Sequence, residues 1–187
     1  MKKNVSILVM VMISFQFLAC NNNTDKQNTT ETVSQNAKGQ SGVLDDVSQK
    51  NVVQVAVSSK DHTTLVTAIK VAGLVDALSN AGPFTVFAPT NDAFALLPAG
   101  TVDDLLKPEK KEALADILQY HVSVGVFKTD MMSDGQIIGQ VNGDNIAISK
   151  KDGKIIINGH AVITAMIPAS NGIIYVIDKV LLPPAKK

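Results

Sequence analysis

The spacing of hydrophobic positions divides the chain into a helical part and a strand-rich part. Over residues 62–78 and 109–121, apolar side chains recur at steps of three and four, which predicts amphipathic helices. Asp61 is the expected N-cap of the first helix, and Gly73 is expected to break or kink it. Gly82, followed by proline, ends this stretch. The first half of the folded part is therefore predicted to be helical.

From residue 126 onward the pattern is that of strands. Short β-branched runs recur about every ten residues, which predicts strands at 137–138, 146–148, 155–157, 162–164 and 173–177. Pairs of Asn or Asp with Gly, which adopt left-handed backbone easily, separate the runs at 142–144, 152–153, 158–159 and 171–172. A sheet of such strands must bury one face, and we expect the helices to pack against that face. The sequence thus predicts an α+β domain over residues 43–187.

A further strand is expected between the two helical stretches. Residues 84–88 alternate as a core strand does, and the ring of Phe87 is expected in the core. Pro89 stops the strand, and either Thr90 or Asn91 can cap the helix that follows. The apolar side chains after the cap are expected to return to the core: Phe94, Leu96 and Leu97. This block predicts a strand–turn–helix joint with a structural role.

The amino terminus predicts the compartment. Lys2 and Lys3, the apolar run 5–15 and a small residue before Cys20 form the three parts of an export signal. The run is too short for a permanent helix across a hydrocarbon layer about 30 Å thick. Cys20 is the only cysteine, and its setting resembles the lipobox of bacterial lipoproteins. Residues 1–19 are the predicted signal peptide, and an ordinary signal with an incidental cysteine is the alternative.

Residues 20–42 are predicted to be a lipidated cysteine followed by a flexible polar tether. The segment is rich in Asn, Thr, Gln and Ser and nearly lacks large apolar residues, so it cannot offset its ordering entropy. As a random coil it would span about 25 Å. The expected location is the bacterial cell envelope and not the cytoplasm. Within the envelope the outer membrane or cell surface is favoured, and the protein is expected to contact the membrane through its lipid.

Charge argues against one class of partner. The formal net charge is zero, and all 17 basic residues are lysines. Arginine is the usual bidentate reader of phosphate and guanine, and the lysines form no stripe that could follow a phosphate backbone. Nucleic acid is therefore not an expected partner.

Two blocks carry a specific resemblance. Residues 84–94, FTVFAPTNDAF, resemble the first signature of the fasciclin domain, and residues 171–183, NGIIYVIDKVLLP, resemble the second. Residues 117–122 are similar to the Tyr-His segment of that family, and the resemblance is strongest over 48–183. The signature residues, with a structural or interaction role, are Phe84, Thr85, Phe87, Ala88, Pro89, Thr90, Asp92, Phe94, Tyr120, His121, Asn171, Gly172, Tyr175, Asp178 and Pro183.

The resemblance implies a fold and a function. The implied fold is a wedge or sandwich of two β-sheets with helices packed on it, and the implied role is extracellular adhesion or recognition. Family partners include integrins, matrix proteins and glycans. Two departures stand out: Met166 and Ile167 replace an Asp-Ile pair tied to integrin binding in animal members, and Tyr175 replaces a common histidine. An integrin contact by that route is therefore not expected.

The three histidines are candidate ligands or catalysts. His121 shares the apolar face of its helix, which favours a buried histidine bonded to Tyr120 or to a backbone carbonyl. His62 opens a helix and His160 begins a strand, and no two histidines have the four-residue spacing of paired ligands on one helix. A zinc site would need groups from distant segments.

Other chemistry has a blander explanation in each case. No Gly-x-Ser-x-Gly elbow is present, and the adjacent aspartates at 45–46 and 103–104 are typical of solvated helix starts rather than hydrolase pairs. Residues 142–145 resemble half of a calcium loop but lack its downstream Glu, which favours a turn. We therefore expect no catalytic, cofactor or metal residue.

The leading interpretation is a non-catalytic recognition module that binds an extracellular protein or glycan. The alternative is a carrier or sensor of a small ligand or polysaccharide, and a hydrolase ranks third. Met131 and Met132 could form an exposed recognition patch or pack inward, and the sequence leaves both open.

Overall fold

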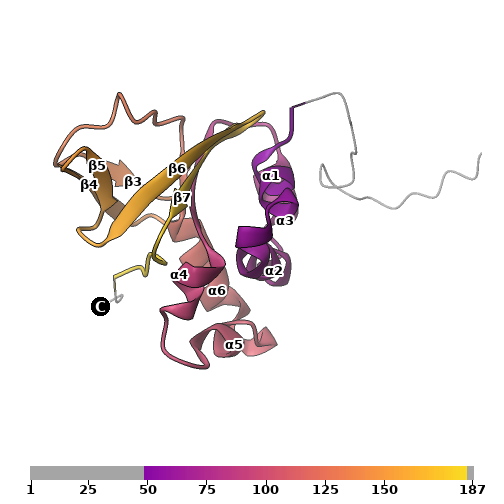
Figure 1. Cartoon of the computed structure of the whole chain (residues 1–187). Helices are drawn as coiled ribbons and strands as arrows, with labels where there is room; N and C mark the ends of the chain where they lie inside the picture. Colours follow the sequence, from indigo (N-terminus) through magenta and orange to yellow (C-terminus); the bar gives the residue numbers. More distant parts are fainter. Residues whose placement is uncertain (1–48, 185–187) are drawn as a thin grey trace, which may run out of the picture. The chain divides into compact units, whose positions relative to one another are not determined.

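The computed structural model describes residues 49–184 (Figure 1). Its helices are α1 (Val52–Ser58), α2 (Thr63–Ala72), α3 (Val75–Ser79), α4 (Asn91–Ala95), α5 (Thr101–Leu105) and α6 (Lys111–Tyr120), with 3₁₀ turns η2 (Lys60–His62) and η3 (Pro108–Lys110). Its strands are β1 (Phe84–Pro89), β2 (Val122–Val124), β3 (Ile137–Gly139), β4 (Asn145–Lys151), β5 (Lys154–Ile157), β6 (Ala161–Ala169) and β7 (Gly172–Ile177). The predicted α+β class is confirmed. The predicted signal peptide, Cys20 and tether lie outside the described residues.

The strands form one mixed sheet in the order β2-β1-β7-β6-β5-β4-β3. All neighbours are antiparallel except β1 and β7, which run parallel from Phe84 beside Gly172 to Pro89 beside Ile177. The two ends of this order meet, because the Val141 N–H just after β3 donates to the Val122 carbonyl of β2 at 2.8 Å. The two expected sheets are therefore two halves of one sheet that nearly closes on itself.

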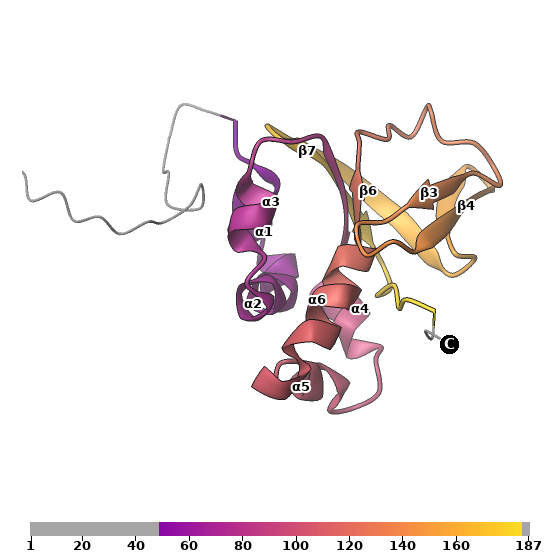
Figure 2. The same cartoon turned by 180° about the vertical axis from the view of Figure 1, so that it is seen from behind.

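Two hydrophobic clusters lie on opposite faces of the central strands. Ile174 of β7 packs with side chains of α1, α2, α3 and α6, whereas Ile173, Tyr175 and Ile177 pack with β3, β4 and β5 inside the curved sheet. Figures 1 and 2 show the helices α1–α3 on one side of β7 and β3–β5 on the other. Burial on both faces explains why β7 reads as a continuous apolar run rather than an alternating one.

Left-handed backbone is found at three of the four predicted turns, including Gly143 with φ 92°, and not at the fourth. Asp152 and Asn158 have φ angles of 52° and 51°, and each precedes a glycine at 73°, as a two-residue hairpin turn requires. Asn171 and Gly172 were expected to be left-handed as well, and neither has a positive φ. Gly172 is needed for another reason, since a Cβ there would collide with the backbone of Phe84.

Three local predictions were wrong. Asp61 is not an N-cap: Ser59 caps η2, and the amide of Thr64 in the first turn of α2 donates to Asn91 Oδ1 at 3.0 Å. Leu96 does not reach the core, because 70% of it is exposed. The strand-rich second part of the domain begins at Val122 rather than after 126, since β2 follows α6 almost directly. Gly73, by contrast, ends α2 in left-handed backbone, with φ 75°.

Within residues 49–184, the helices are all too short or too polar to cross a membrane.

Candidate functional site

The two signature blocks lie side by side, because they are the parallel strands β1 and β7. The rings of Phe87 and Tyr175 occupy one register position and stack at 5.9 Å between centroids with an interplanar angle of 22°. Both residues are fully buried. The sequence separated these residues by more than eighty positions, and the pairing shows that the signatures form one structural unit.

The polar groups of this unit fasten the segment that follows β2. Thr85 Oγ1 donates to the Gly125 carbonyl at 2.7 Å and accepts from the Phe127 amide at 3.0 Å. The Tyr175 hydroxyl donates to the Phe127 carbonyl at 2.7 Å. Burial, and to a smaller extent the charge of Asp130, raise the pKa of Tyr175. Tyr175 is therefore a neutral donor with a positional task, where the family often has histidine.

The joint after β1 is built as predicted. Thr90 is the N-cap of α4, and its Oγ1 accepts from the Ala93 amide at 3.2 Å. Asp92 is exposed in the first helical turn, where its negative charge interacts favourably with the positive end of the helix dipole. Ala88 and Pro89 are buried, and Phe94 is half-buried beside the helical cluster.

His121 bridges α6 and the C-terminal segment. Its Nδ1 lies 2.7 Å from the Ile117 carbonyl, and its Nε2 accepts from the Leu181 amide at 3.0 Å. A carbonyl only accepts and an amide only donates, so the ring is neutral with its proton on Nδ1. The buried-histidine prediction is confirmed, and the partner is a carbonyl rather than Tyr120. The Tyr120 hydroxyl instead donates to the Asn145 carbonyl and accepts from Asn158 Nδ2.

This arrangement predicts a loss of stability in acid. Burial lowers the pKa of His121 to about 4. Because the unfolded chain binds a proton near pH 6.5 and the folded chain does not, the free energy of unfolding should fall between pH 6.5 and 4. The loss should total about 3 kcal/mol. Urea unfolding at pH 7, 5.5 and 4.5 measures it, and His121→Gln should flatten the slope.

The exposed His160 supplies the control, since His160→Gln should leave that slope unchanged. His62 contributes in the same direction, because burial lowers its pKa against the opposing effects of Asp61 and the Ala88 carbonyl. An unchanged slope in His121→Gln would contradict the assignment.

Asn171 ties the helices to the hairpin between β6 and β7. Its amide nitrogen donates to the carbonyls of Leu78 and Asn80 at 2.8 and 2.9 Å, and its Oδ1 accepts from the Val52 amide at 2.9 Å. Asp178 acts similarly at the other end of β7, where Oδ1 accepts from the Val162 amide at 2.7 Å. Pro183 is half-buried after the last strand. The polar groups of Asn171 and Asp178 are therefore used in hydrogen bonds within the fold.

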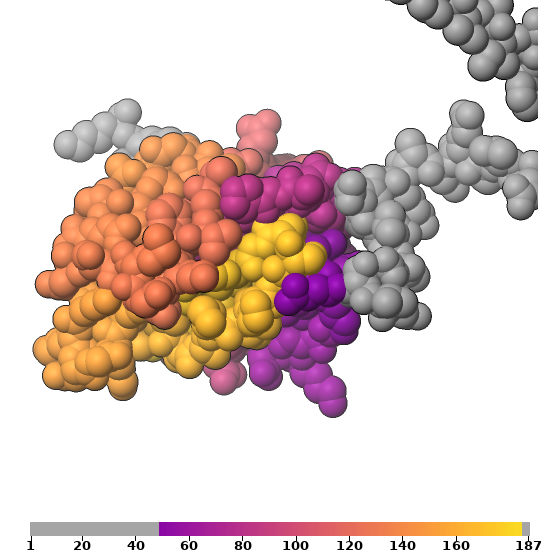
Figure 3. All heavy atoms as spheres, turned by 90° about the horizontal axis from the view of Figure 1, so that it is seen from above, coloured from indigo at the N-terminus to yellow at the C-terminus, as the bar shows by residue number. Residues whose placement is uncertain are grey.

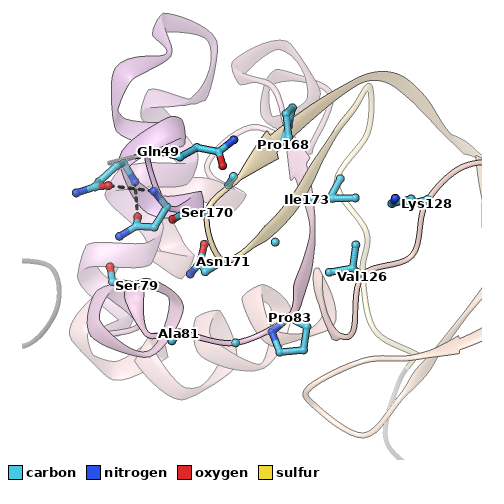
Figure 4. A pocket seen from close by; sticks show the side chains of 15 residues that line it. Gln49, Ser79, Ala81, Pro83, Val126, Lys128, Pro168, Ser170, Asn171 and Ile173 are labelled. Atoms are coloured by element: carbon cyan, nitrogen blue, oxygen red, sulfur yellow. Dashed lines mark hydrogen bonds between the residues drawn. The ribbon is translucent and has the colours of Figure 1, made fainter. Parts of the chain in front are cut away.

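A cleft opens beside the β6–β7 turn, with a volume of about 930 Å³ (Figure 4). Four separate segments line it: the start of α1, residues 79–83, residues 126–128 and the hairpin at 168–173. They meet at one end of the molecule, where the violet, magenta, coral and yellow atoms adjoin in Figure 3. Among the described lining residues, Lys128 alone carries a charge. Sequence reasoning missed this cleft, because its walls are far apart along the chain.

Other candidates from the sequence are not assembled into a site. Met131 and Met132, which the sequence left as either an exposed patch or inward-packed residues, differ from each other. Met131 is 66% exposed, whereas Met132 is 1% exposed and packs in the hydrophobic cluster inside the curved sheet. Asn142 and Asp144 bond to each other in a turn, as expected. Within residues 49–184, no three His, Cys, Asp or Glu side chains are close enough to hold a metal ion.

One buried histidine was not foreseen. His62 is 4% exposed, and its Nδ1 lies 2.8 Å from Ser59 Oγ. Its other ring nitrogen, Nε2, has no hydrogen-bond partner among the described residues. The helical pattern around residues 65–69 is the one signal that could have placed His62 near the apolar face. His62 precedes α2, however, so the helical period does not determine which way its side chain points.

Comparisons with known proteins agree with this geometry. The family model described as "Fasciclin domain" matches residues 60–183. Protein sll1483 of Synechocystis sp. is 50% identical over 137 residues, covering 73% of this chain and 76% of that protein. The cell surface glycolipoprotein MPB83 of Mycobacterium bovis is 39% identical, covering 60% of this chain and 49% of its own length.

Two animal proteins also match. Transforming growth factor-beta-induced protein ig-h3 of Sus scrofa is 38% identical, and the match covers 73% of this chain but 20% of that protein. A solved pair of FAS1 domains from the insect cell adhesion molecule fasciclin I superposes with a TM-score of 0.65 at 20% identity, covering 71% of this chain and 51% of that one. The chain belongs to the fasciclin domain family.

Proposed function

We propose that this protein is a surface-anchored, non-catalytic recognition module that binds an extracellular protein or glycan. The observation that carries the proposal is that the polar signature groups are used up internally. Thr85, Tyr120, His121, Asn171 and Tyr175 each bond to backbone groups of the same domain. Buried groups held in this way keep a surface rigid and offer no free acid, base or nucleophile.

The relatives support the same role. Fasciclin domains are associated with adhesion and cell-surface proteins, and one solved relative is described as an insect cell adhesion molecule. The name of MPB83 describes a cell surface glycolipoprotein. For this chain, the lipobox-like setting of Cys20 supports an acyl anchor, and two or more acyl chains hold a protein stably on a membrane.

The cleft is the binding face that we assign to this module. Its walls combine apolar side chains with backbone and amide groups, which suits a partner segment that is partly apolar. The alternative function, a carrier of a small ligand between helices and sheet, has less support. The apolar cavity that α2, α4 and α6 enclose measures about 20 Å³, which is room for about one water molecule.

One experiment with four versions of the chain tests the proposal. Cells that display the wild type should take up labelled palmitate into the protein and attach to matrix-coated or glycan-coated surfaces. Cys20→Ser should lose both the palmitate and the attachment. Ser170→Arg, which adds bulk at the cleft rim, should keep the palmitate and lose at least tenfold in attachment.

The matched control is Ser133→Arg, an exposed turn serine outside the cleft, and it should behave like the wild type. Attachment by Ser170→Arg at the wild-type level would reject the cleft as the binding face. Equal attachment by cells that lack the protein would reject the recognition function itself. Palmitate in the Cys20→Ser protein would reject the anchor.

A further inference from the structure

The wall of the cleft that follows β2 has unused backbone groups. Phe127 bonds inward with both of its own, since its amide donates to Thr85 Oγ1 at 3.0 Å and its carbonyl accepts from the Tyr175 hydroxyl at 2.7 Å. The amide and carbonyl of Val126 and the amide of Lys128 have no hydrogen-bond partner among the described residues. In an extended chain the backbone groups of neighbouring residues point to opposite sides. This wall therefore has the pattern of a strand edge that is bonded on one side only.

Side chains along this wall alternate as well. Val126 and Lys128 line the cleft, whereas Phe127 packs against the hydrophobic cluster inside the curved sheet. Val126 is 39% exposed and Lys128 is exposed, so solvent reaches both. Figure 4 shows these two side chains and Ile173 along one wall, with Ser79 at the opposite wall. An extended segment laid along this wall would meet free backbone groups and every second side chain.

The side chains of the cleft suit a ligand that is partly apolar and partly acidic. Its apolar surface includes Pro83, Pro168 and Ile173. Lys128 is the one charged residue in the described lining, and it forms no ion pair with any other residue between 49 and 184. A carboxylate on the ligand would complement this cation, and apolar groups next to the carboxylate would cover the remaining surface.

One buried hydroxyl in the cleft wall lacks a partner. Ser79 lines the cleft and is 5% exposed, and its Oγ makes no hydrogen bond within the described part of the chain. Buried polar groups are nearly always bonded, so this hydroxyl suits a ligand rich in donors and acceptors, such as a peptide backbone. Aromatic rings, the large flat apolar surfaces on which a sugar ring could stack, are missing from the described lining. These features favour a polypeptide over a glycan.

We propose that the cleft binds an extended, acidic segment of a partner protein, which adds as a strand to the edge at Val126 and Lys128. One residue of the segment pairs with the Val126 carbonyl and the Lys128 amide. An acidic side chain pairs with Lys128 Nζ, and apolar side chains contact Pro168 and Ile173. Main-chain bonds give such complexes affinity, and the side-chain contacts give them specificity. The inference rests on the proposed function, because it takes the cleft as the binding face.

Selection from a random peptide library tests the partner class. Phage that display random peptides are selected on the purified full chain, and the enriched sequences are read. The wild type should enrich one Asp or Glu with apolar residues on both sides. Lys128→Glu should enrich Lys or Arg at the same place. Lys110→Glu, which changes an equally exposed lysine outside the cleft, should return the acidic consensus.

The library gives a decision in either direction. No enrichment above background, or a consensus without an acidic residue, would overturn the proposal. The same acidic consensus on Lys128→Glu would also overturn it, because the cation would then have no part in binding.

The most enriched peptide then tests strand addition. Methylation of one peptide nitrogen at a time removes a single backbone donor, and fluorescence anisotropy measures the affinity for the full chain. Methylating the amide that donates to the Val126 carbonyl should weaken binding at least tenfold, and methylating either neighbouring amide should change it less than threefold. An equal effect at consecutive amides, or no effect at any, would overturn strand pairing.

Competition and rim substitution separate the peptide from a glycan. Ser170→Arg should weaken binding of the selected peptide at least tenfold, whereas Ser133→Arg should leave it unchanged. Polygalacturonate, an acidic glycan, should not displace the peptide. Displacement at an equal concentration of carboxylate would assign the cleft to a glycan and overturn the proposal.

These measurements use the purified chain and no cells, so their failure is distinct from failure of the proposed function. Attachment that depends on Ser170 without any peptide binding would reject the partner class alone. Peptide binding in a protein that gives cells no attachment would reject the recognition function in attachment and leave the peptide site standing.

Discussion

Replacing Phe87 by alanine is expected to lower the free energy of unfolding by about 3–5 kcal/mol. The ring is 0% exposed and stacks on Tyr175 within the inner cluster. Truncation would leave a cavity that the surrounding β-branched side chains cannot fill without moving the central strands. Urea unfolding monitored by circular dichroism measures the change.

Phe94→Ala is the matched control, since the same ring is removed from a half-buried position on α4. Its cost should be clearly smaller. A loss below about 1 kcal/mol for Phe87→Ala would mean that the ring is not in a close-packed core.

Replacing Gly172 by alanine is expected to cost about 3 kcal/mol and to open the parallel pairing of β1 and β7. A Cβ at this position would collide with the carbonyl oxygen of Phe84 and lie 2.8 Å from its carbonyl carbon and 3.0 Å from its nitrogen. These are backbone atoms of a buried strand, so the clash cannot be relieved by a side-chain rotation. Thermal unfolding and amide exchange along β1 measure both effects.

Gly139→Ala provides the comparison, because Gly139 also lies in a strand and its added Cβ would meet Asn145 Oδ1 at an ordinary 3.6 Å. Its stability should stay within about 0.5 kcal/mol of the wild type. Equal losses in the two variants would show that glycine is favoured at 172 for a reason other than close approach.

Several predictions that rested on local pattern were accurate, although the Asp61 cap and the burial of Leu96 were not. The strand predicted at 84–88 and found at 84–89, the Thr90 cap and the hairpin turns at 152–153 and 158–159 each depend on a few neighbouring residues. The resemblance added what pattern could not supply, namely that all of these elements belong to one known fold. His121 was correctly assigned to the core, because its position on the apolar helix face decides its burial.

Three of the failures have a common physical cause, namely contacts between residues that are far apart in the sequence. β2 has three residues and is defined by its pairing with β1 rather than by its own pattern. Asn171 lies in the predicted turn, but it was expected to adopt left-handed backbone and does not. Its three bonds reach residues about ninety to one hundred and twenty positions away. The cleft likewise exists only when four distant segments meet. Contacts of this range depend on the assembled fold and leave no periodic trace in the sequence.

The place of β7 in the sheet has a consequence for biogenesis. Among the strands of residues 49–184 this one is synthesised last, yet it lies between β1 and β6 and contributes to both hydrophobic clusters. A nascent chain that ends before residue 177 has a gap at the centre of its sheet, and closing that gap joins residues far apart in sequence, which slows folding. The sheet of residues 49–184 therefore cannot be completed until β7 has been synthesised, and until then β1 and β6 lack the strand that joins them.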